Sequence, residues 1–77
     1  MSKIPEKMQK EYADMNKEID TIEHQIGKLN NERKLLQKQG KRAEMEAADK
    51  KIAELNETKV HLLSKKKKFD QKLKQFQ

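Results

Sequence analysis

The sequence predicts an all-α fold, an antiparallel two-helix coiled-coil hairpin that forms a single domain over residues 1–77. Three observations support this prediction. Apolar residues recur at alternating steps of three and four positions in both halves of the chain, which is typical of a helical seam. The two recurrences are out of phase, and a glycine lies where the phase changes. The expected elements are a helix at 4–39, a turn at about 40–41 and a helix at 42–76.

The first helix is predicted from one continuous stripe of mainly apolar residues. Pro5 is expected in the first turn, where its missing N–H needs no partner, and Glu6 suits the positive end of the helix dipole. The members of the stripe are Met1, Met8, Tyr12, Met15, Ile19, Ile22, Ile26, Leu29, Arg33 and Leu36.

The turn is predicted from the step of nine residues between Leu36 and Met45. At about 100° per residue, nine steps leave a net half turn, so one unbroken helix would carry the two stripes on opposite sides. A chain that folds back at Gly40 lets the stripes meet, and glycine readily adopts the left-handed conformation that ends many helices. No Ser, Thr, Asp or Asn begins the second helix, so it is expected to lack a side-chain cap.

The second helix carries a matching stripe, and the two stripes predict a register of ten layers from Leu36–Met45 to Pro5–Phe76. The members of this stripe are Met45, Ala48, Ile52, Leu55, Lys59, Leu62, Lys66, Phe69, Leu73 and Phe76. Beside the seam, the register places acids opposite lysines, which favours this orientation. The expected flank pairs are Glu32–Lys51, Glu18–Lys65 and Glu11–Lys72.

The composition indicates that the hairpin is stabilised by association with another chain. Charged residues make up 42% of the chain and hydrophobic residues 32%. A single narrow seam in a chain of 77 residues is marginal on its own, so we expect a homodimer, in the form of a four-helix bundle, or another protein partner. The chain contains no cysteine and shows neither a secretory signal nor an apolar run of about 20 residues, so a cytoplasmic location is expected.

A small, partly apolar patch on the second helix is the predicted partner-binding surface. It comprises Ala53, Val60 and Leu63, together with Gly27 of the first helix. Gly27 has two interpretations, a tolerated surface glycine or a position where another helix approaches closely. The patch likewise has an alternative interpretation, as isolated surface apolar residues without a role.

The end of the hairpin that carries both termini is strongly basic. Residues 1–16 and 65–77 hold nine lysines against four acids, a net charge of +5, whereas residues 17–27 and 52–64 have a net charge of −3. Such a cluster can neutralise phosphates without reading sequence, so nucleic acid or ribosome binding is the alternative function. The residues for phosphate contact are Lys3, Lys7, Lys10, Lys65, Lys66, Lys67, Lys68, Lys72 and Lys74. A solvated lysine run is the simpler interpretation.

No enzyme, metal or cofactor site is predicted. The histidines His24 and His61 lie outside the seam, and the sequence has no phosphate-binding loop, zinc-ligand spacing or nucleophile motif. Membrane-surface binding is not expected either, because the apolar stripe is already occupied by the other helix. The sequence therefore predicts a small non-catalytic protein–protein interaction module, of the adaptor, scaffold or inhibitor type, that acts through its exposed helix faces.

Overall fold

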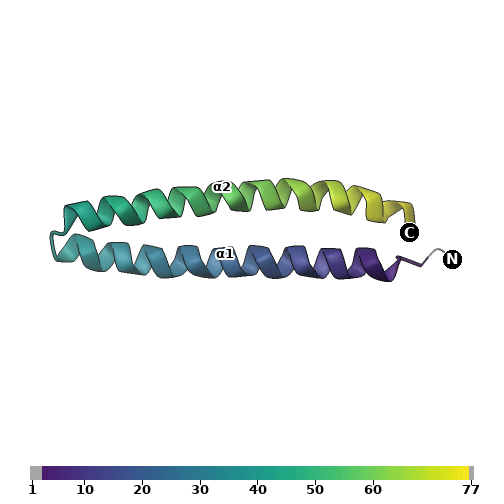
Figure 1. Ribbon diagram of the computed structural model, residues 1–77, viewed down its shortest axis with the longest axis horizontal. Coiled ribbons are helices and arrows are strands. Elements are labelled where there is room, and N and C mark those ends of the chain that lie inside the picture. The colour runs from purple at the N-terminus through teal and green to yellow at the C-terminus, as the bar shows by residue number, and fades with distance from the viewer. Residues whose placement is uncertain (1–2, 77) are drawn as a thin grey trace.

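The computed structural model describes residues 3–76 and confirms the all-α helical hairpin (Figure 1). Helix α1 spans Glu6–Lys38, helix α2 spans Arg42–Leu73, and a 3₁₀ turn, η1, spans Lys74–Phe76. The hairpin measures 60 × 15 × 15 Å, and the start of α1 lies beside the end of α2. Met1, the first member of the predicted stripe, lies outside the described residues.

Helix α1 begins two residues later than the sequence predicts, because Pro5 acts as the N-cap and not as part of the first turn. Its ψ of 142° is extended, and its carbonyl accepts hydrogen bonds from the N–H groups of Met8 and Gln9, both at 3.0 Å. Ile4 precedes the proline and is therefore disfavoured in the helical region. The carbonyl of Ile4 instead accepts a hydrogen bond from the Gln9 side chain, at 2.8 Å.

The turn closes through a Schellman motif centred on Gly40, which has a φ of 71°. The N–H of Gly40 donates to the carbonyl of Gln37 at 3.2 Å, and the N–H of Lys41 donates to the carbonyl of Leu36 at 3.0 Å. These bonds satisfy carbonyls that the end of α1 would otherwise leave unpaired. Helix α2 then starts from Lys41 without a side-chain cap, as expected from the sequence. Helix α1 ends at Lys38, one residue before the predicted end.

The seam buries the residues of the two predicted stripes, but few of them completely. Every stripe residue from Met8 to Leu36 and from Met45 to Phe76 is buried or half-buried. Among the described residues, only Ile19, Ile22 and Ala48 are less than 9% exposed. Helix α2 ends at Leu73, and the last predicted stripe residue, Phe76, lies in η1. The core is thus a single narrow row in which most side chains still contact water.

Contacts between the helices support the predicted register. The rings of Tyr12 and Phe69, which share a predicted layer, stack with centroids 5.9 Å apart and planes at 29°. In the middle of the hairpin the ammonium of Lys59 lies 3.5 Å from a carboxylate oxygen of Glu23, next to the predicted partner Ile22. Near the turn Arg33 pairs with Asp49, next to its predicted partner Ala48. These contacts fix the relative position of the helices along most of their length.

The three predicted flank pairs do not form. Within residues 3–76 the ion pairs are Arg33–Asp49 and Lys59–Glu23, so the acids Glu11, Glu18 and Glu32 are not paired with lysines. The pairs that do form involve cations of the seam itself. A cation in a partly apolar row gains by placing its charged head against an acid at the edge of that row. The pairs remain about one-third to one-half exposed, so each contributes at most about 1 kcal/mol.

Candidate interaction surfaces

The predicted contact patch of Gly27, Ala53, Val60 and Leu63 is exposed on one side of the hairpin. Val60 is 65% exposed and Leu63 is 44% exposed, so both apolar side chains are in contact with water. A Cβ added at Gly27 would meet nothing within 4 Å, so the packing of the hairpin itself does not require a glycine there. The patch is therefore available to another molecule.

The two ion pairs lie along the same side as the contact patch. Asp49 is four residues before Ala53 and Glu23 is four residues before Gly27, so each acid shares a helix face with a patch residue. By joining the helices, the Arg33–Asp49 and Lys59–Glu23 pairs cover the seam on this side near the turn and in the middle. Closer to the termini, a groove on this side has Tyr12 and Leu73 in its lining.

The opposite side of the hairpin is less covered, and grooves there expose the floor of the seam. One groove near the turn has Leu29, Leu36 and Ala48 in its lining, and a second, farther along, has Leu29 and Leu55. A third has Ile22 and Leu62. We call this side the open face. On each helix it consists of two rows that repeat every seven residues, an inner row next to the seam and an outer row farther from it. The inner row is Glu11, Glu18, Gln25, Glu32 and Gln39 on α1 and the adjoining turn, and Glu44, Lys51, Thr58, Lys65 and Lys72 on α2. The outer row is Lys7, Asp14, Thr21, Lys28 and Leu35 on α1, and Ala47, Glu54, His61, Lys68 and Gln75 on α2 and η1.

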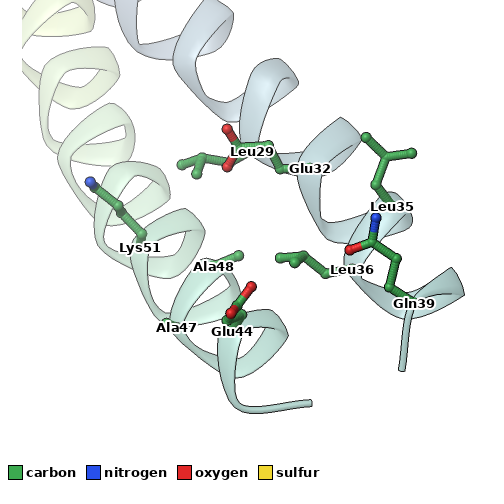
Figure 2. Close-up of a pocket in the computed structure, with 9 residues that line it drawn as sticks. All are labelled: Leu29, Glu32, Leu35, Leu36, Gln39, Glu44, Ala47, Ala48 and Lys51. Atoms are coloured by element: carbon green, nitrogen blue, oxygen red, sulfur yellow. The ribbon is translucent and has the colours of Figure 1, made fainter. Parts of the chain in front are cut away.

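Figure 2 shows the groove near the turn. Leu36 and Ala48 lie between the two helices, whereas Leu35 stands on the outer side of α1. Leu35 is 58% exposed and has no apolar partner among the seam layers. The sequence-based reasoning missed this residue because its neighbour Leu36 accounted for the stripe. The signal in the sequence was an apolar residue in the outer row of α1, whose other members, Lys7, Asp14, Thr21 and Lys28, are polar.

The basic end brings together the lysines that the sequence singled out. Lys3 lies just before α1 and Lys74 in η1, the others lie at the start of α1 and the end of α2, and all but Lys66 are exposed. The ammonium of Lys66 lies 5.5 Å from the centroid of the Tyr12 ring, a cation–π distance. None of these lysines forms an ion pair with an acid of residues 3–76. Tyr12 and Phe69 are engaged with each other in the seam, so they are not presented for stacking on bases.

The described part of the chain contains no group of three or more His, Asp or Glu residues placed to hold a metal ion. His24 and His61 are both exposed. Neither of the two described helices is long and apolar enough to cross a membrane. Comparison of the chain with protein-family models, with curated proteins and with solved structures finds no match.

Proposed function

We propose that the hairpin is a small non-catalytic protein–protein interaction module that binds other helices, or a second copy of itself, through its exposed helix faces. The observation that carries this proposal is the surface that the isolated hairpin leaves in water. Its accessible area is 6546 Å², about a third more than the ~4,900 Å² expected for a compact monomer of 9.1 kDa. A standard interface buries about 800 Å² on each partner, so the surplus is enough for one such interface.

The contact patch supports the same proposal. Val60 and Leu63 are one helical turn apart and both exposed, and Gly27 on the neighbouring helix adds no side chain that would hinder an approaching helix. A module of this kind would act as an adaptor, scaffold or inhibitor, and we expect it in the cytoplasm.

The test is a pair of variants in a binding experiment. Val60→Glu with Leu63→Glu is expected to weaken capture of protein partners from nuclease-treated lysate by at least about tenfold, because two charges would replace the apolar contacts of an interface centre. The matched control, Ala43→Glu with Gln71→Glu, adds two acids at exposed positions of α2 that lie at least eight residues from Val60 and Leu63. Far-UV circular dichroism is expected to show equal helicity for both variants. Undiminished capture by the patch variant would show that the patch is not the binding surface.

A second candidate function, nucleic acid binding, is favoured by one specific observation: the lysines of the basic end have no acidic partners in the described structure. We expect a gel shift with generic RNA or DNA at low salt that weakens steeply as salt rises. Replacing Lys65, Lys67 and Lys68 with Gln should make the log–log salt slope shallower by about 0.9 for each lost contact with duplex DNA. A chain that does not bind either nucleic acid at low salt would eliminate this candidate.

A further inference from the structure

The outer row of the open face shows a pairing that the hairpin itself does not use. At equal heights along the hairpin, Asp14 of α1 corresponds to Lys68 of α2, and Lys28 corresponds to Glu54. Near the turn, the exposed Leu35 corresponds to Ala47. None of these charged residues forms an ion pair within residues 3–76. At the other two levels Lys7 corresponds to Gln75 and Thr21 to His61, so three of the five levels of the outer row match opposite charges or apolar residues.

The inner row of the open face shows the same pattern. The three flank pairs that the sequence predicted match an acid of α1 with a lysine of α2 at the same height, and they too are unformed. The matched residues of both rows would come into contact if α1 of one hairpin lay against α2 of another hairpin at the same height. A twofold axis parallel to the helices produces this arrangement, and every matched pair then occurs twice.

In the other twofold arrangement the hairpins run in opposite directions, and the inner row does not match. Reversing one hairpin on the open face places Glu11 opposite Glu32 of the second copy, and Lys51 opposite Lys72 of the second copy. The outer row keeps opposite charges, with Asp14 opposite Lys28 and Glu54 opposite Lys68, but Leu35 comes opposite Lys7 and so away from any apolar residue. Like charges placed directly opposite each other are unfavourable, so the rows discriminate between the two directions.

We propose that a second copy of this chain packs on the open face, with both turns at the same end and α1 of each copy against α2 of the other. The inference rests on the proposed function, because it takes a helix face as the binding surface, and it names the partner and the face. Leu35 then seats beside Ala47 of the second copy, over the groove whose lining includes Leu36 and Ala48 (Figure 2).

A charge exchange between two separately produced chains tests the pairing. Asp14→Lys and Lys68→Asp are each expected to raise the dimer dissociation constant about threefold to thirtyfold, because each homodimer would contain two like-charged pairs. Mixing the two variants should restore the wild-type constant, since every pair in the heterodimer is again of opposite charge. Sedimentation equilibrium gives the constants. Failure of the mixture to associate more tightly than either variant alone would overturn the proposed arrangement.

A second variant tests the apolar contact and separates this inference from the proposed function. Leu35→Glu should raise the dissociation constant at least about tenfold, whereas Leu63→Glu, on the opposite side, should leave it unchanged. Both residues are largely exposed, so helicity by circular dichroism is expected to stay the same. A wild-type chain that remains monomeric at high micromolar concentration would overturn the inference. The contact patch of the proposed function is tested separately, and undiminished capture by the contact-patch variant would rule out that patch without affecting the dimer.

Discussion

Deleting residues 38–42 is expected to convert the hairpin into one straight helix of roughly 100 Å, at 1.5 Å per residue. The deletion removes Gly40 and the bonds of the Schellman motif, and it brings Met45 four positions after Leu36. Four is a regular step of the stripe, so both halves of the seam would lie on one side of a continuous helix. Two such helices can pair in antiparallel orientation, and every layer of the hairpin then forms between the two molecules.

Small-angle scattering measures the expected change directly. The maximum dimension should rise from about the 60 Å of the hairpin to roughly 100 Å, and the species should be a dimer. Gly40→Asn is the matched control, because asparagine tolerates the left-handed conformation and should keep the turn. If the deletion variant kept the wild-type dimension, the phase change between the stripes could not be what makes the chain fold back.

Replacing Ile22 with Ala is expected to abolish most of the helicity at 25 °C. Ile22 is only 8% exposed, and removing a buried isoleucine side chain down to alanine costs about 2–5 kcal/mol. A small single core seldom supplies more than about 3–5 kcal/mol in total, and only two other described residues are as deeply buried as Ile22. Thermal unfolding followed by circular dichroism, at a fixed protein concentration, provides the measurement.

Val60→Ala is the control for this second experiment. It also shortens a β-branched side chain on a helix, but Val60 is 65% exposed, so the free energy of unfolding should change by less than about 0.5 kcal/mol. Equal losses of stability in the two variants would mean that the seam is not the source of cohesion.

The seam could be predicted from the sequence because helical periodicity and burial are directly linked. Each stripe residue within the described helices is buried or half-buried, and the Tyr12–Phe69 contact agrees with the predicted layer. The turn could be predicted equally well, because Gly40 lies where the phase of the apolar stripe changes. The second helix starts at Arg42, as predicted, whereas the other three helix ends differ from the prediction by one to three residues. At the start of the first helix the reason is the proline, which the sequence placed inside the first turn and which in fact caps the helix.

Side-chain pairing between the helices was less predictable. The flank pairs were expected because acids and lysines face each other beside the seam. The ion pairs that form instead join the seam cations Arg33 and Lys59 to Asp49 and Glu23. This choice covers the contact-patch side and leaves the grooves on the other side uncovered. The uncovered grooves of the open face are therefore related to which cations enter the seam, a feature that counting apolar residues does not reveal.

The closure at Gly40 also determines the order in which the chain can assemble. The layer of Leu36 and Met45 joins residues only nine positions apart, so the entropy lost in forming it is small. Each pair of layers beyond it adds seven residues from each helix, and its partners are already held near each other by the layers before. The layers can therefore form in order from the turn outward. The layers at the end with both termini, where the lysines repel one another, form last and separate first.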